Sequence, residues 1–176
     1  AKGVSWADIF PRLAARPSEL QSHVMSVPLP EPGELVIIES DTGSGKTEAA
    51  LALYARLRSA GRADGLFFAL PTRATAAAMH ARIREFAEAF CPEAAGNMVL
   101  AAGGSATHRR EDAIEPRSDD DTESAAVLHW ASRSLTKAFA GELVVGTIDQ
   151  ALLASLPVKH AHLRLAALTR LVIVVD

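Results

Sequence analysis

The segment Ser40-Asp41-Thr42-Gly43-Ser44-Gly45-Lys46-Thr47 decides the fold, because this glycine-rich string follows an apolar run and opens a helical stretch. That context is typical of a phosphate-binding loop. Gly43 and Gly45 let the backbone turn tightly and aim several N–H groups inward, and the helix N-terminus adds a positive dipole end. We expect Lys46 to reach the β- and γ-phosphates of ATP, and Thr47 to give its hydroxyl to Mg²⁺. The other residues of the predicted nucleotide cradle are Asp41, Thr42 and Ser44.

Short apolar runs alternate with alanine-rich helical stretches through the rest of the chain. The runs are residues 35–38, 66–70, 98–101, 143–145 and 171–175. Each is too short and too continuous for a surface strand, so we interpret them as buried parallel strands. The helical stretches cover residues 47–59, 75–90 and 124–139, with a further pair within 149–170. The alternation predicts an α/β fold, a mostly parallel sheet with helices on both faces.

The composition fits one globular chain with a sizeable core: 176 residues, 49% hydrophobic and 22% charged. We assign residues 1–33 to a helical annex, in which Ser5 and Ser18 serve as N-caps, and residues 34–176 to the nucleotide-binding domain. The net charge of -3 provides no bulk positive field, so any nucleic-acid contact must come from local groups. Cys91 is the only cysteine, and no signal peptide or long apolar span is present. We therefore expect a cytoplasmic protein with no membrane contact.

Two residues outside the loop are further nucleotide candidates. Asp176 follows the apolar run 171–175. In P-loop ATPases, an aspartate in this position holds Mg²⁺ on the side opposite the loop threonine. The alternative is an aspartate that only ends a core strand. Gln21 lies 25 residues before Lys46 and could offer its amide to the N6 and N7 edge of adenine. The alternative is an exposed helix glutamine.

Five motifs stand in order along the chain, and their order and spacing resemble the motifs of superfamily 2 helicases. They are Gln21, SDTGSGKT at 40–47, LPTRATA at 70–76, VVGTIDQALLA at 144–154 and VIVVD at 172–176. Ser40 stands where the strict loop pattern begins with glycine, and helicase-type loops tolerate small residues there. More narrowly, DTGSGKTEAAL, FALPTRATA, GTIDQALLA and LPVKHAHLR look like the CRISPR-associated helicase-nuclease of type I systems.

This resemblance implies a first RecA-like domain, with Gln21 reading adenine and Asp176 as the first residue of the DExH box. It also implies an enzyme that is recruited by the Cascade complex and degrades invading DNA. The family has an HD nuclease before such a domain, and a second RecA-like domain with an arginine finger after it. We find no His-Asp doublet in this chain and assign no nuclease metal site. The isolated chain is expected to be inactive.

In superfamily 2 motors, the loops at the carboxyl ends of the strands contact the backbone of single-stranded DNA without sequence preference. By resemblance, Thr72, Arg73 and Thr147 occupy this position. The alternative for both threonines is ordinary helix capping. A small basic cluster could also reach a phosphate, and it consists of Lys159, His160, His162 and Arg164. Separately, the polar segment 103–123 fits no helix or strand pattern.

Two other functions share the phosphate loop. A small-molecule kinase would need an acceptor pocket and lid arginines, and the aspartate after the last apolar run argues against it. An ATP-gated binding module without catalysis would lack the water-activating residue and the arginine finger. We favour the ATP-dependent DNA translocase or helicase over both.

Overall fold

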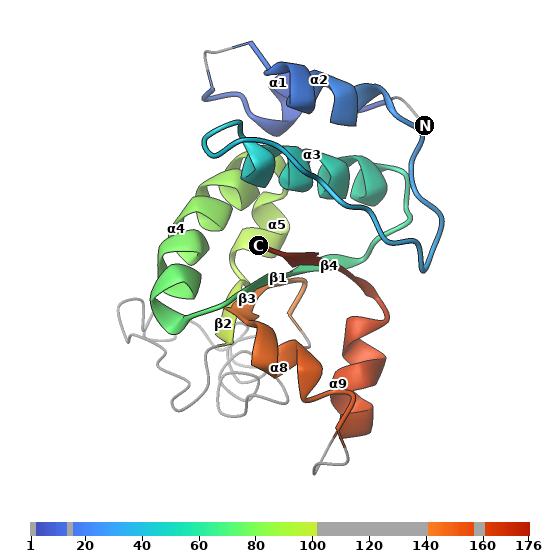
Figure 1. The fold of residues 1–176 in the computed structure, drawn as a ribbon, viewed down its shortest axis with the longest axis vertical. Helices are drawn as coiled ribbons and strands as arrows, with labels where there is room; N and C mark the ends of the chain where they lie inside the picture. The colour runs from blue at the N-terminus through green and yellow to red at the C-terminus, as the bar shows by residue number, and fades with distance from the viewer. Residues whose placement is uncertain (1–2, 14–15, 102–140, 157–160) are drawn as a thin grey trace, which may run out of the picture.

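The computed structural model describes residues 3–13, 16–101, 141–156 and 161–176, and Figure 1 shows their arrangement. The predicted helix 124–139, the segment 103–123, Lys159 and His160 lie outside the described residues, as does the side chain of Arg164. The helices are α1 (Trp6–Ile9), α2 (Glu19–Ser26), α3 (Lys46–Ser59), α4 (Arg73–Phe90), α5 (Pro92–Ala95), α8 (Ile148–Leu152) and α9 (Ala161–Leu168). The strands are β1 (Gly65–Leu70), β2 (Val99–Ala101), β3 (Leu143–Thr147) and β4 (Leu171–Val175).

The strands form one four-stranded sheet in the order β2-β3-β1-β4, and every pairing is parallel. Leu70 pairs with Thr147, and Ala69 pairs with Val175. The carboxyl ends of β1, β3 and β4 therefore meet at one edge of the sheet. The backbone N–H of Asp176 donates to the carbonyl oxygen of Ala69 at 3.1 Å, which fixes the residue after β4 at that edge. The predicted α/β fold with a parallel sheet is confirmed.

Alternation along β1 divides the interior into two cores, one on each face of the sheet. Leu66, Phe68 and Leu70 point into a core shared with α1 to α5. Phe67 and Ala69 point into a smaller core closed by Ala154 and Leu168, after α8 and in α9. All of these β1 side chains are buried, which explains why the run reads as continuously apolar. Figure 1 shows α3 above the sheet and α4 toward its left, with α8 and α9 below it.

The N-terminal helices begin where their serines predict. Ser5 and Ser18 both form capping boxes, in which the serine side chain accepts the N3 backbone N–H and the N3 side chain accepts the cap N–H. The guanidinium of Arg56 in α3 donates to the carbonyl oxygens of Val24 and Val27. These charge-assisted bonds hold the end of α2 against α3.

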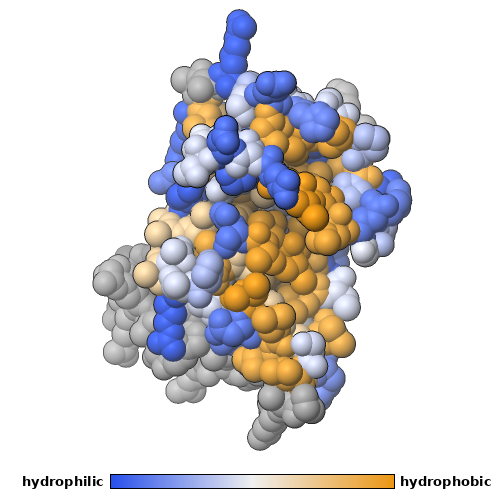
Figure 2. Space-filling view, viewed as in Figure 1, coloured by the Kyte–Doolittle hydropathy of each residue, from blue (hydrophilic) through white to orange (hydrophobic). Residues whose placement is uncertain are grey.

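The predicted strand 35–38 is wrong in this structure, because these residues form no strand. Leu35 is 85% exposed and Ile37 is 72% exposed. An apolar run becomes a strand only when a neighbouring strand pairs with it, and none of the described strands pairs with this segment. The predicted burial of β4 is also only partly correct. It is an edge strand, with Val175 62% exposed, and Figure 2 shows hydrophobic residues gathered over β4 and α9.

Candidate nucleotide-binding site

The phosphate-binding loop has the backbone that its glycines require. Gly43 has a φ of 80° and Gly45 a φ of 87°, and both values lie in the left-handed region that favours glycine. Gly45 is also the N-cap residue of α3, so the helix begins directly beneath the loop. A Cβ at Gly45 would overlap the amide nitrogen of Gln21. This glycine is therefore required both by its conformation and by its close neighbour.

Lys46 is folded back onto the loop. Its Nζ donates to the carbonyl oxygens of Ser40 and Asp41, each at 2.8 Å. The ammonium thus lies within the turn of the loop, held by two neutral acceptors. A phosphate is an anionic acceptor and forms stronger hydrogen bonds with an ammonium than a carbonyl does. The lysine can exchange these carbonyls for phosphate oxygens without leaving the loop.

Helix α2 supports the loop from the outside. The hydroxyl of Ser18 donates to the carbonyl oxygen of Ser44 at 3.2 Å, and Nε2 of Gln21 donates to the carbonyl oxygen of Gly45 at 3.3 Å. Oε1 of Gln21 also accepts the backbone N–H of Ser18 at 2.9 Å. The structure thus brings Gln21 to the phosphate loop, 24 residues away in sequence. Sequence reasoning missed this contact, although Ser18 and Gln21 have the three-residue spacing of a capping box.

The hydroxyl of Ser44 is buried, and it has no hydrogen-bond partner within the described part of the chain. A buried hydroxyl without a partner is unfavourable, and it is available to a ligand that reaches the loop. The predicted cradle residues Asp41, Thr42 and Gly43 are exposed, whereas Gly45, Lys46 and Thr47 are half-buried.

The three predicted DNA contacts lie at the carboxyl edge of the sheet but differ in availability. Thr72 caps α4, because its hydroxyl accepts the backbone N–H of Thr75 at 3.2 Å. Thr147 is only 4% exposed, and its hydroxyl donates to the Asp149 carboxylate at 3.2 Å. Arg73 is exposed, and within the described residues its guanidinium has no hydrogen bond or ion pair. Of the three, Arg73 is the side chain that is free to contact a phosphate. His162, from the basic cluster, is exposed on α9.

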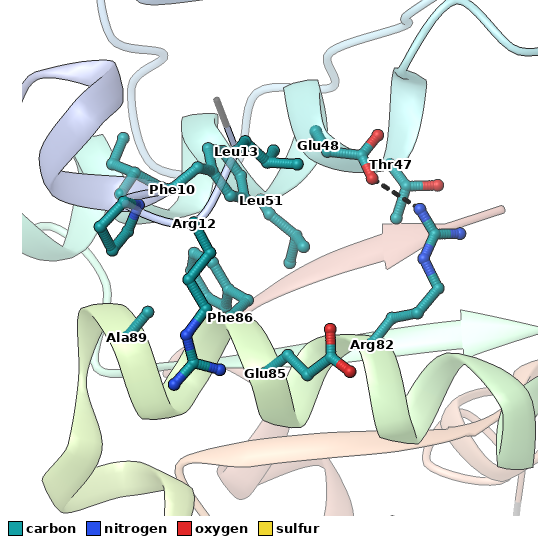
Figure 3. Close-up of a pocket in the computed structure, with 12 residues that line it drawn as sticks. Phe10, Arg12, Leu13, Thr47, Glu48, Leu51, Arg82, Glu85, Phe86 and Ala89 are labelled. Carbon is teal, nitrogen blue, oxygen red and sulfur yellow. Dashed lines mark hydrogen bonds and ion pairs between the residues drawn. The ribbon is translucent and has the colours of Figure 1, made fainter. Parts of the chain in front are cut away.

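A cavity of about 140 Å³ opens beside the first turn of α3, between α4 and the segment after α1. Leu13, Leu51 and Phe86 are among its apolar lining residues. Figure 3 shows Glu48 and Arg82 pointing toward each other at one side of this cavity, next to Thr47. Their Oε1 and Nη2 atoms are 2.6 Å apart. Neither residue was predicted from sequence as part of the site: Glu48 lies within the quoted segment DTGSGKTEAAL but was given no role, and Arg82 belongs to none of the quoted motifs.

This chain has the features of a P-loop nucleotide-binding domain of the α/β class: a parallel sheet, a glycine-rich loop with left-handed glycines, and a helix that begins at that loop. The sequence model of the DEAD/DEAH box helicase family matches residues 18–129, and the chain belongs to this family. Within it, the chain is similar to proteins named Cas3. It is 41% identical over 165 residues to the CRISPR-associated endonuclease/helicase Cas3 of Escherichia coli K12. It is 33% identical over 180 residues to the Cas3 of Thermus thermophilus.

These alignments cover 92% and 97% of this chain, but only 18% and 19% of the two relatives. Among solved structures, T. fusca Cas3 with AMPPNP superimposes with a TM-score of 0.75 at 32% identity, covering 98% of this chain and 19% of that one. T. fusca Cas3 with ADP gives a TM-score of 0.72 at 31% identity. The predicted resemblance to the CRISPR-associated helicase-nuclease, and the RecA-like fold, are confirmed. The comparisons do not favour the small-molecule kinase.

No helix of the described residues is both long enough and apolar enough to cross a membrane. Nor do these residues contain a group of three or more His, Cys, Asp or Glu side chains arranged to hold a metal ion.

Proposed function

We propose that this chain is the ATP-binding first motor domain of an ATP-dependent single-stranded-DNA translocase or helicase that acts in CRISPR antiviral defence. The observation that carries the proposal is the phosphate loop at Ser40–Thr47, which opens α3 in a parallel α/β fold and is supported by α2. The nucleotide complexes of T. fusca Cas3 support an adenine nucleotide as the ligand.

In this proposal, nucleotide binding begins with an exchange of partners at Lys46. The ammonium leaves the carbonyl oxygens of Ser40 and Asp41 and binds phosphate oxygens instead. Backbone N–H groups of the loop and the N-terminus of α3 add to the binding of the anion. The unpartnered hydroxyl of Ser44 is a further donor. Gln21 reads the adenine edge, and to do so its amide gives up one of its present partners.

Mg²⁺ fits the two oxygen donors that we assign to it. The Thr47 hydroxyl comes from the first turn of α3, and the Asp176 carboxylate comes from the end of β4. Hydroxyl, carboxylate and phosphate oxygens are the hard ligands that Mg²⁺ prefers. When bound, the ion neutralises charge on the phosphate oxygens during transfer. The roles of Thr47 and Asp176 are to orient it.

The DNA strand would lie along the carboxyl edge of the sheet, with Arg73 as the principal side-chain contact and with Thr72 and Thr147 beside it. We further propose that a Cascade-type effector complex supplies the DNA. We also propose that a second RecA-like domain and an HD nuclease belong to the same polypeptide. The chain spans less than a fifth of the length of its relatives, so these parts would lie outside it.

Replacing Lys46 with Ala in the full-length protein tests the function. We expect ATP binding or hydrolysis to be lost while circular dichroism stays unchanged, because the substitution removes a phosphate-binding charge from a loop. ATPase assays with and without single-stranded DNA, and with small phosphate acceptors, provide the readout. Wild-type ATPase in Lys46→Ala contradicts the loop assignment. Phosphorylation of a small acceptor without DNA stimulation supports the kinase instead, and nucleotide binding without any turnover supports the ATP-gated module.

A further inference from the structure

The Glu48–Arg82 ion pair joins the first turn of the phosphate-loop helix to α4, whose N-terminus carries the proposed DNA contact. We propose that Arg82 is a positioning residue that, through Glu48, couples DNA binding at the start of α4 to ATP turnover. This inference rests on the proposed function, and it assigns to Arg82 the connection between the DNA contact on α4 and the ATP site at the start of α3.

The Glu48 end of the pair lies against the phosphate loop. Glu48 follows Thr47 directly, in the first turn of α3, where a carboxylate is also favoured by the helix dipole. Its Oε2 lies 3.6 Å from the position that a Cβ on Gly45 would take. The side chain is only 25% exposed. The carboxylate therefore lies beside the loop backbone at Gly45.

The Arg82 end of the pair lies in the middle of a long, continuous helix. Helix α4 runs without interruption from Arg73 to Phe90, so Arg73 and Arg82 are about 14 Å apart along the helix axis. Beyond Arg82 the helix is anchored in the core, where Phe86 contacts the ring of Tyr54 with centroids 6.3 Å apart. Ala76, Met79 and Ile83 are buried in the same core, so the helix is held along its length. A displacement of its N-terminus would therefore reach Arg82 as a movement of the whole helix.

The ion pair is an isolated link between the two helices, and it lies at the side of a cavity. Within the described residues, it is the only ion pair that joins α3 to α4. The cavity beside it separates the two helices from the segment after α1 (Figure 3). The side chain of Arg82 is 53% exposed, so it can change position without displacing a core residue. Because of this exposure, we expect the pair to add little to stability. Its loss should therefore change the stimulation by DNA more than the unfolding temperature.

The test compares Arg82→Gln with Arg84→Gln in the full-length protein. Arg84 is the matched control: it is an exposed arginine two residues further along α4, with no ion pair to α3. We expect Arg82→Gln to keep the basal ATPase rate and the KM for ATP, and to lower the stimulation by saturating single-stranded DNA about five-fold, the lower end of typical coupling between sites. Arg84→Gln keeps the full stimulation.

Two further variants separate positioning from simple loss of structure. Arg82→Lys retains the positive charge and should restore part of the stimulation. In the double variant Glu48→Gln with Arg82→Gln, the stimulation should equal that of Arg82→Gln alone, because the two residues act as one unit. Thermal unfolding of each variant shows whether folding has changed, and Arg82→Lys decides the question if Arg82→Gln is less stable.

Three results would overturn the coupling role: wild-type stimulation in Arg82→Gln, equal losses in Arg82→Gln and Arg84→Gln, or no rescue by Arg82→Lys. In all three the unmodified protein is still stimulated by DNA, so the proposed function stands. If DNA does not stimulate the unmodified protein, the proposed function fails and the coupling fails with it.

Discussion

At the scale of single residues, Gln21 has an observed contact with the phosphate loop and a proposed role in reading adenine. The motif order predicts that it reads adenine, whereas the structure shows its amide between Ser18 and Gly45. The contact was not predictable, because it depends on how α2 is placed over a loop 24 residues away. The conformation of Gly43 and Gly45 was predictable, since a phosphate-binding turn requires a positive φ whatever the surrounding fold.

Gln21→Ala and Ser18→Ala distinguish the two tasks. Both variants remove a hydrogen bond to the loop, and both should raise the KM for ATP and GTP. Only Gln21→Ala removes the amide that we propose reads adenine, so it should also lower the preference for ATP over GTP, by about ten-fold for one discriminating hydrogen bond. The measurement is kcat/KM for each nucleotide in the full-length protein. An unchanged preference in Gln21→Ala leaves this residue with its structural task alone.

At the scale of elements, sequence patterns predicted where helices and strands lie along the chain better than they predicted which segments pair in the sheet. The run 171–175 coincides with β4, and Ser5 and Ser18 cap the helices that they precede. Capping and apolar periodicity are local, so they can be read from a few residues. Strand pairing is not local. The run 35–38 is as apolar as β4 but forms no strand, and three of its four side chains are exposed. Nothing in its own residues distinguishes it from a strand.

Arg58 links several elements at the amino edge of the sheet. Its guanidinium donates to the carbonyl oxygen of Asp64 and to the carboxylates of Glu93 and Glu142, at 2.9 to 3.2 Å. It also lies 3.4 Å from the hydroxyl of Tyr54. Burial raises the pKa of Tyr54 to about 12, so the phenol stays neutral and accepts a hydrogen bond from Arg58. These bonds join the end of α3 to the segments that precede β1 and β3, and to α5.

We predict that Arg58→Met destabilises this end of the sheet by about 1–2 kcal/mol, because it removes several charge-assisted hydrogen bonds whose carboxylates are themselves largely exposed. Arg62→Met is the control, since Arg62 is more exposed and pairs with only one carboxylate, that of Glu31, among the described residues. Hydrogen exchange of peptides from α3 and β1 measures the local effect. Equal protection in the two variants would show that the Arg58 network adds no more than an ordinary surface pair.

At the scale of the whole molecule, the sites cluster on one side of the sheet. The phosphate loop, the start of α4 and the C-terminus all lie toward the left of Figure 1. For the start of α4 and the C-terminus this position follows from the parallel sheet, because β1 and β4 direct their carboxyl ends to the same edge. It was therefore predictable from the alternation of strands and helices. The Glu48–Arg82 contact was not, because it depends on the distance between α3 and α4.

The net charge of -3 shapes the expected DNA binding of the whole molecule. Without a bulk positive field, each phosphate contact has to come from a particular cation, and Arg73 is an exposed one at this edge. We predict that Arg73→Ala weakens single-stranded-DNA binding about equally for all sequences, because a phosphate contact carries no sequence information. The dependence of log affinity on log salt concentration should become shallower by about 0.7, the single-strand value for one neutralised phosphate.

The affinity for ATP without DNA should hardly change in Arg73→Ala, because within the described residues Arg73 has no bond to the phosphate loop. Fluorescence anisotropy with several oligonucleotides, over a series of salt concentrations in the full-length protein, measures the slope. Arg84→Ala, which removes a charge from the same helix farther from the sheet edge, is the matched control. If both variants lower the slope equally, the charge of α4 acts only as a general field. If Arg73→Ala and Thr147→Ala both keep wild-type affinity and slope, Thr72 and Thr147 are local structural residues and the DNA follows another path across the molecule.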